Sequence, residues 1–191
     1  MVKKSLLPML TAMLSLACVP TGCKPDKAGP PAASSAALLT RNNCYSLLHQ
    51  LLDEQKDVSI LRFIKKEHSD VKNLVQKIAA ASGAASALLE DFAKHDPGLT
   101  LDDIGLPLGE TATRDAIAWT EKKELLGHTG HEFELDLLLT QIEALSYASH
   151  LAKIAGENDS QSDRAHALAA VSKDMENLHQ EVFVMLLSKR K

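Results

Sequence analysis

The residues with the clearest chemical spacing in this chain are Glu176 and His179, which form a Glu-x-x-His motif near the C-terminus. Residues three apart lie on one face of a helix, so both side chains could reach the same metal ion. A di-iron centre of the ferritin type needs two such motifs and a carboxylate from each of two further helices. The chain contains only this one Glu-x-x-His, so we predict neither a di-metal oxidase nor any catalytic residue.

His68 is the second histidine with a defined place, because it falls in an apolar pattern that steps by threes and fours. Such a pattern is typical of the buried face of a bundle helix. We therefore expect His68 to lie in the core, close to His179 on a facing helix. With Glu67 and Glu176, the two histidines would form a buried polar cluster or hold a metal ion. The pattern comprises Leu61, Ile64, His68, Val71, Val75 and Ile78.

Two further histidines, His128 and His131, lie beside glycines in a segment that interrupts a helical pattern. They could chelate a surface transition metal weakly, although the sequence offers no obvious third ligand. A solvent-exposed turn between helices is the favoured interpretation. The remaining histidines share no spacing pattern and receive no assignment: His49, His95, His150 and His166.

The elements that position these residues are predicted to be helices. Aromatic residues make up only 4% of the chain, alanine and leucine are plentiful, and no segment alternates in the manner of a strand. We predict an all-α fold, a four-helix bundle with one long connection and a bipartite third helix. The expected helices span residues 36–53, 57–95, 111–155 with an interruption at 127–130, and 160–191.

Three local features follow from this assignment. Asp57 is expected to cap the second helix, and Ser160 to Asp163 to form a capping box for the last one. Residues 111–126 are expected to be amphipathic around Ile117 and Trp119. Residues 131–155 are apolar on nearly every face, so this segment should be the most buried in the bundle.

The N-terminal residues have the pattern of an export signal. Lys3 and Lys4 precede an uncharged apolar stretch too short to span a bilayer, which ends in Ala17-Cys18. We predict cleavage before Cys18 and lipidation of this cysteine, with Cys23, which follows Gly22, as the alternative anchor. Residues 1–17 are then the signal peptide, 18–35 the anchor with a flexible Pro-, Gly- and Ala/Ser-rich tether, and 36–191 the folded domain.

Charge and cysteine content narrow the class of protein. The formal net charge is −4 and becomes −6 when the signal peptide takes its two lysines away, which argues against nucleic acid as a partner. Apart from the two candidate anchors Cys18 and Cys23, the chain contains only Cys44, so no internal disulfide or cysteine-based zinc site is expected in the folded domain. Its apolar neighbours indicate a small buried side chain.

Four short stretches of the chain also carry a family likeness. They are Lys66-Glu67-His68 followed by Val71 and Leu74, Leu106-Pro107, Gly127 with Phe133-Glu134-Leu135-Asp136 and Gln141, and Leu178-His179. With them, the chain resembles a family of bacterial exported ferritin-like domains of unknown function, described as predicted outer-membrane proteins. The resemblance implies a ferritin-like bundle. The family usually has a histidine four residues after the glutamine, and because Leu145 stands there, a site of three histidines would lack one ligand.

These observations predict a lipid-anchored protein of the bacterial cell envelope that acts as a binding or structural module without catalysis. Val19 follows Cys18 in place of the aspartate typical of inner-membrane retention, so we expect the outer membrane, facing the periplasm. The expected partners are the membrane, through the anchor, and a protein or small molecule whose identity the sequence leaves open. No cofactor is predicted. The alternatives are a ferritin-like protein that binds or oxidises iron or another transition metal, and a carrier of an apolar ligand.

Overall fold

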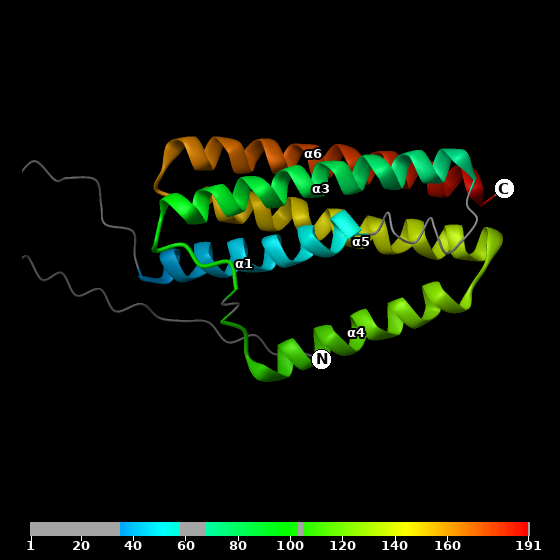
Figure 1. Cartoon of the computed structure of the whole chain (residues 1–191), viewed down its shortest axis with the longest axis horizontal. Coiled ribbons are helices and arrows are strands. Elements are labelled where there is room, and N and C mark those ends of the chain that lie inside the picture. The colour runs from blue at the N-terminus through cyan, green and yellow to red at the C-terminus, as the bar shows by residue number, and fades with distance from the viewer. Residues whose placement is uncertain (1–34, 58–67, 103–104, 191) are drawn as a thin grey trace, which may run out of the picture. The chain divides into compact units, whose positions relative to one another are not determined.

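A computed structural model describes residues 35–57, 68–102 and 105–190, and all regular structure in these ranges is α-helical. The helices are α1 (Ser35–Asp57), α3 (Ser69–His95), α4 (Leu108–Gly127), α5 (Gly130–Glu157) and α6 (Ser162–Lys189) (Figure 1). They belong to one compact unit, Ala33–Lys191, and the predicted all-α class is confirmed. None of these helices combines the length and the apolar character that crossing a membrane requires. The predicted leader, Cys18, Cys23 and Glu67 lie outside the described residues.

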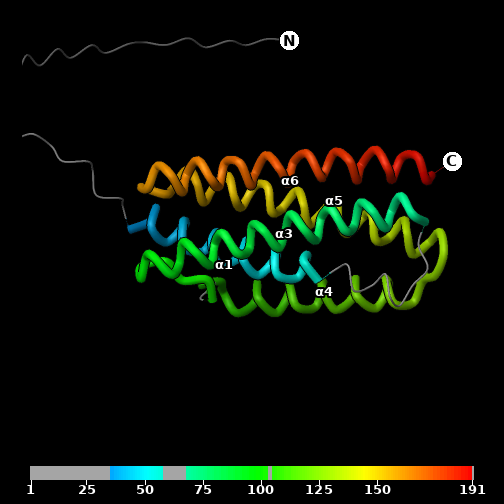
Figure 2. Tube along the Cα trace, turned by 45° about the horizontal axis from the view of Figure 1, so that its top comes forward, coloured from blue at the N-terminus to red at the C-terminus, as the bar shows by residue number. Residues whose placement is uncertain are grey.

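Four of the five helices pack side by side as a bundle, in the cyclic order α1, α3, α6 and α5 (Figures 1 and 2). Each helix runs antiparallel to its two neighbours, as contacts between helices establish. α3 and α5 therefore lie diagonally across the bundle and run in the same direction. The contacts that fix these directions are Asp53 with Ser86, Asp70 with Lys189, Lys77 with Glu181, Ser149 with Ser172, and Tyr45 with Asp159.

The connection from α3 to α5 must return along the length of the bundle, because these two helices are parallel. Helix α4 makes most of this return and lies antiparallel to α5 (Figure 1). The predicted interruption at residues 127–130 is confirmed, but the two parts are separate antiparallel helices, α4 and α5, instead of one bipartite third helix. The reversal depends on extended backbone at His128 and Thr129 and on Gly130, whose φ of +61° is strained for any residue with a side chain.

The core lies between the four packed helices, and α5 contributes most to it, with ten buried residues. The prediction that residues 131–155 form the most buried segment is thus confirmed. Burial of each large aliphatic side chain contributes about 1.5–3 kcal/mol. Cys44 is buried as predicted. Fully enclosed side chains of the core include Tyr45, Leu48, Leu52, Ile78, Leu89, Leu138, Leu145, Leu168 and Met175.

Two predicted helix starts are wrong. Asp57 is the last residue of α1 rather than a cap, and α3 begins at Ser69 with His68 as its N-cap. α6 begins at Ser162 with Gln161 as N-cap and no side-chain cap, so the capping box expected from Ser160 does not form. Both errors have one physical cause, because Ser and Asp are favoured in turns as well as at helix N-caps, so their presence alone does not locate a helix start.

A polar network holds the start of the α3–α4 connection against α1. Arg41 and Asn42 both donate to the carbonyl of Gly98, at 3.2 and 3.0 Å, and Ser46 donates to the carbonyl of Thr100 at 2.8 Å. These bonds satisfy backbone groups that a loop packed on a helix would otherwise leave without partners.

A second group of polar contacts joins this region to α6. Arg164 bonds Asp96 at 2.8 Å and Asp159 at 2.9 Å, and the Tyr45 hydroxyl donates to Asp159 at 2.8 Å. Although burial raises the pKa of Asp159, the bonds from Arg164, the Gln161 backbone and Tyr45 leave it below its usual value. Asp159 therefore stays ionised and links α1 to the turn before α6.

Candidate functional site

His68 does not lie in the core. Its side chain is 73% exposed at the N-cap of α3, and its ring Nδ1 lies 2.8 Å from Oε1 of Glu134 on α5. The His68 backbone N–H donates to the same oxygen at 2.5 Å. The expectation of a core histidine is therefore wrong, because His68 precedes the first residue of α3 and its side chain is exposed.

His68 and His179 are not brought together. Asp70 pairs with Lys189 and Lys77 with Glu181, so His179 lies level with residues 79–80 of α3. At a rise of 1.5 Å per residue, His68 is about 17 Å away along the bundle. Glu176 is exposed and pairs with Lys173, while His179 is half-buried. The proposed cluster of His68, Glu67, Glu176 and His179 therefore does not assemble among the described residues.

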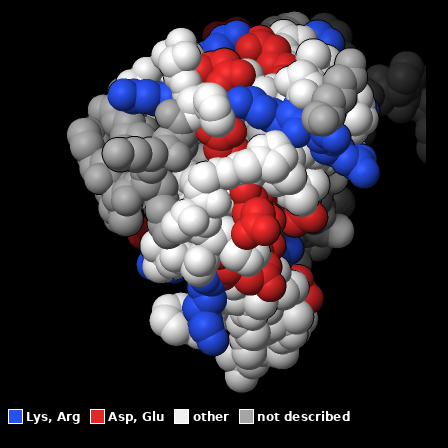
Figure 3. Space-filling view, turned by 90° about the vertical axis from the view of Figure 1, so that its right-hand side faces the viewer, with Lys and Arg blue, Asp and Glu red and all other residues white. Residues whose placement is uncertain are grey.

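The partner of His68 belongs to an ionic cluster at the end of the bundle where α3 begins and α6 ends. Glu134 is only 1% exposed, and Lys189 lies 3.3 Å from its second oxygen and 3.1 Å from Asp70. Burial raises the pKa of Glu134, but the bonds from His68 and Lys189 outweigh it and leave the pKa below its usual value. Acidic and basic side chains lie next to one another on this end (Figure 3). The cluster fixes three helix ends, which is a structural role.

His128 lies in the exposed turn between α4 and α5, as predicted, whereas His131 is an exposed residue in the first turn of α5. The His128 ring is bonded to Asp136, and this bond raises the pKa of the imidazole. His128 is thus engaged by a carboxylate in the second turn of α5. No third metal-ligating group joins it in the part of the chain that the structure describes.

Helix α4 offers the first candidate binding surface. It lies along the outside of the bundle beside α5 and contains no buried residue (Figure 2). Ile117 and Trp119, around which an amphipathic helix was expected, are both exposed. Leu108 is 89% exposed, Trp119 is 63% exposed, and Leu126 is also exposed. The three side chains lie on one stripe of the helix, because the steps of 11 and 7 residues between them are close to whole numbers of turns.

Few contacts hold α4 in place. Arg114 donates to the Tyr147 hydroxyl of α5 and lies over the ring of this tyrosine at 5.0 Å. Leu125 packs on a small cluster at the start of α5 that contains Phe133 and Leu137. The opposite side of the helix, which carries Trp119, remains turned away from the bundle. Exposed large apolar side chains on one stripe are typical of surfaces that bind another molecule.

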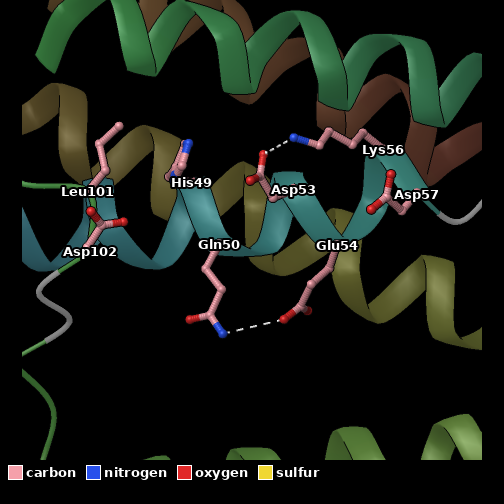
Figure 4. Close-up of a pocket in the computed structure, with 8 residues that line it drawn as sticks. All are labelled: His49, Gln50, Asp53, Glu54, Lys56, Asp57, Leu101 and Asp102. Atoms are coloured by element: carbon pink, nitrogen blue, oxygen red, sulfur yellow. Dashed lines mark hydrogen bonds and ion pairs between the residues drawn. The ribbon is translucent and has the colours of Figure 1, made fainter. Parts of the chain in front are cut away.

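The second candidate is an open hollow of about 540 Å³ on the surface of α1. Figure 4 shows that His49, Asp53 and Lys56 point toward α3, while Gln50 and Glu54 point to the other side. Leu101 and Asp102 close one end. The described lining contains four carboxylates and a single lysine, so the potential of the hollow favours cations.

Two residues that line this hollow, His49 and Asp53 of α1, form a group of ligand-type side chains with Glu90 of α3. One donor atom from each lies within 4.8 Å of the other two, and the His49 Nε2 to Glu90 Oε1 distance is 3.7 Å. The His49 side chain is 15% exposed, and its Nε2 is shielded from solvent without a hydrogen-bond partner. An orphaned buried nitrogen beside two carboxylates is the feature that most needs a chemical explanation.

Asp53 is held in a fixed orientation. Ser86 of α3 donates to its Oδ1 at 2.6 Å, and Lys56 donates to the same oxygen at 2.7 Å. Burial raises the pKa of Asp53, but these two bonds outweigh it and leave the pKa below its usual value. The carboxylate is therefore ionised at neutral pH.

Sequence reasoning left His49 without a role. Its spacing of four from Asp53 places both on one helix face, and this is the signal that could have paired them. Glu90 comes from another helix, so only the packing of α1 on α3 identifies it.

Comparisons with protein-family models, curated proteins and solved structures found no match for the chain.

Proposed function

We propose that this protein is a lipid-anchored helical bundle of the bacterial cell envelope that acts as a binding module without catalysis. Helix α4 is the element it presents to a partner protein. The observation that carries this proposal is the stripe of exposed apolar side chains on a helix without any buried residue. A tryptophan on such a stripe is a common anchor of protein interfaces.

The charges on α4 favour a protein over a lipid surface as its partner. The helix carries four acidic and three basic side chains, whereas helices that lie on anionic membranes are rich in Lys and Arg. α4 is already helical in the chain on its own, so binding would not first require the helix to order. A pre-organised helix loses less conformational entropy on association.

The bundle itself is proposed to be ferritin-like, in line with the family resemblance. Two antiparallel pairs, α1 with α3 and α5 with α6, joined by one long connection, support this proposal. Our proposal does not include a di-iron centre in the middle of the bundle. Leu145 is buried at the position of the family histidine, and Glu176 of the single Glu-x-x-His motif is exposed.

The anchor is proposed to be a lipidated Cys18, with Cys23 as the alternative, and the membrane to be the outer one, on its periplasmic side. This assignment rests on the sequence pattern of residues 1–23 and on Val19. It gives α4 a setting in which it meets envelope proteins and does not meet nucleic acid.

Site-specific photo-crosslinking in intact cells tests the role of α4. A photoreactive side chain at position 119 should yield one discrete protein adduct, whereas the same group at Val184, exposed on α6, should not. Leu126→Glu should abolish the adduct and Val184→Glu should retain it. Both changes are at exposed positions, where the free energy of unfolding changes by about 0.5 kcal/mol or less.

The outcome separates the possible occupants of this surface. An adduct with another envelope protein supports the proposal. An adduct with a second copy of the chain, or with phospholipid, would assign the stripe to self-association or to membrane contact and overturn it. Equal labelling from positions 119 and 184 would show that α4 has no preferred partner.

A further inference from the structure

We infer that His49, Asp53 and Glu90 form a binding site for a divalent first-row transition-metal cation on the surface shared by α1 and α3. This site is distinct from the apolar stripe of α4 and from the centre of the bundle. It does not depend on the proposed function of α4, so the two can fail separately.

The donor set indicates the class of cation. An imidazole nitrogen suits Zn²⁺, Fe²⁺, Ni²⁺ and Cu²⁺, whereas sites for Ca²⁺ and Mg²⁺ are built almost wholly from oxygen. One nitrogen with two carboxylates is a borderline set that Zn²⁺, Fe²⁺ and Mn²⁺ accept. Three protein donors also leave coordination positions open for water, as at the surface-accessible metal sites of enzymes and carriers.

The state of His49 points to a missing ligand. Its Nε2 is shielded from solvent, makes no hydrogen bond, and lies 3.7 Å from the nearest oxygen of Glu90, beyond hydrogen-bond distance. A buried nitrogen of this kind is costly unless a water or an ion supplies its partner. A cation between His49 and Glu90 would satisfy the nitrogen and the carboxylate together.

The hydrogen bond from Ser86 prepares Asp53 as a metal ligand. The Ser86 hydroxyl donates to Oδ1, which orients the carboxylate, in the way that outer-shell hydrogen bonds orient the ligands of known metal sites. No bond of Oδ2 to another described residue is found, so this oxygen is available for coordination. Glu54, Asp57 and Asp102 line the same hollow and add to its attraction for a cation.

Binding requires a small contraction of the three donors. Donors in a tetrahedral site with metal–ligand distances near 2.1 Å lie about 3.4 Å apart, while the present donors lie within 4.8 Å of one another. Glu90 can close most of this difference by rotation, because its side chain is 46% exposed. His49 and Asp53 are separated by four residues on one helix and need move little.

Lys56 opposes the metal. Its Nζ lies 2.7 Å from Oδ1 of Asp53 and neutralises part of the charge that would attract the cation. Lys56 is itself about two-fifths exposed, so it can swing into solvent when a cation arrives. Its removal should therefore raise metal affinity, a result that a purely structural role for the cluster does not predict.

Metal titration of the purified full chain, first stripped with a chelator, tests the inference. The parent chain should bind one equivalent of Zn²⁺ that His49→Gln does not bind with the same affinity. Added Co²⁺ should show the visible absorption of an ion ligated by nitrogen and oxygen. We expect His49→Gln and Glu90→Gln each to weaken Zn²⁺ binding at least tenfold. Lys56→Gln should tighten it about threefold or more, as removal of a competing charge requires.

The chain offers a matched control on the neighbouring helix. Asp91 and His95 of α3 form a histidine–carboxylate pair with the same four-residue spacing but without a third ligand, so His95→Gln should leave this equivalent unchanged. Glu90 is too exposed for Glu90→Gln to unfold the chain, which circular dichroism can verify. Zn²⁺ binding that is the same in His49→Gln, Glu90→Gln and the parent chain, or weaker binding in Lys56→Gln, would overturn the assignment. Absence of any Zn²⁺ binding by the parent chain would do the same.

Discussion

At the scale of single residues, the core depends on how fully each apolar side chain of α5 is enclosed. Leu138 has no solvent exposure, whereas Ile142, one turn further along, is only half-buried and packs at the edge of the core. The sequence pattern assigned both to the core with equal weight. The structure separates them because α5 has a covered side toward α1 and α6 and an outer side that is partly open.

Leu138→Ala should accordingly lower the free energy of unfolding by about 2–5 kcal/mol, because it removes buried methyl groups and leaves a cavity. Ile142→Ala should cost clearly less, and Lys122→Ala on exposed α4 should change stability by about 0.5 kcal/mol or less. Urea unfolding of the three variants at one pH measures the differences. Equal losses for Leu138→Ala and Lys122→Ala would mean that the core is misplaced.

At the scale of elements, the start of α3 is held from outside the helix. α3 has no side-chain cap of its own, and the Glu134 carboxylate of α5 accepts the N–H of its N-cap residue His68. A carboxylate at a helix N-terminus also interacts favourably with the helix dipole. One buried side chain thus joins α3, α5 and, through Lys189, the end of α6.

Glu134→Gln should therefore destabilise the fold by about 1.5–3 kcal/mol at neutral pH, the range for hydrogen bonds to charged groups. The pKa of Glu134 in the folded chain lies below its ordinary value of 4.5. Its charge thus stabilises the fold above that pH, and this stabilisation is lost as the pH falls through the lowered pKa. Unfolding measured at pH 7 and near pH 3 should show the gap between parent and variant closing at low pH. A gap that widens in acid would contradict the role given to this carboxylate.

At the scale of the whole molecule, the exposed helix α4 is combined with a bundle that does not need it for its core. α4 contributes no buried residue, while α1, α3, α5 and α6 share one continuous cluster of buried side chains. The parallel arrangement of α3 and α5 requires a long connection, and this chain uses the connection as a surface helix. The proposed lipid anchor would fix the protein to the envelope in which α4 meets its partner.

Cys18→Ala should then prevent acylation and move the protein out of the membrane fraction or leave it unprocessed. Labelling with a fatty-acid probe, followed by fractionation, measures both effects, and Cys23→Ala should behave like the parent chain. Retained labelling in Cys18→Ala, with loss in Cys23→Ala, would transfer the anchor to Cys23. Labelling of neither cysteine would remove the lipid-anchored proposal.

The sequence alone was sufficient for the helical class, the burial of Cys44 and the central place of residues 131–155. Each of these depends on composition or on apolar periodicity within one segment. The sequence alone did not predict the features that depend on contacts between segments. The pattern around His68 placed this residue inside a helix, although it precedes the first residue of α3. The amphipathic pattern of residues 111–126 did not show that α4 has no buried residue.

Only the tertiary structure decided which polar residues meet. In the sequence, Glu134 was named only as part of a family resemblance. Its position beside His68 and Lys189 depends on how α3, α5 and α6 are aligned along the bundle. His49 and Asp53 could be paired from their spacing, but Glu90 lies about forty residues away on another helix. Local periodicity fixes the face on which a side chain lies, whereas the identity of the side chain opposite it is set by the packing of whole helices.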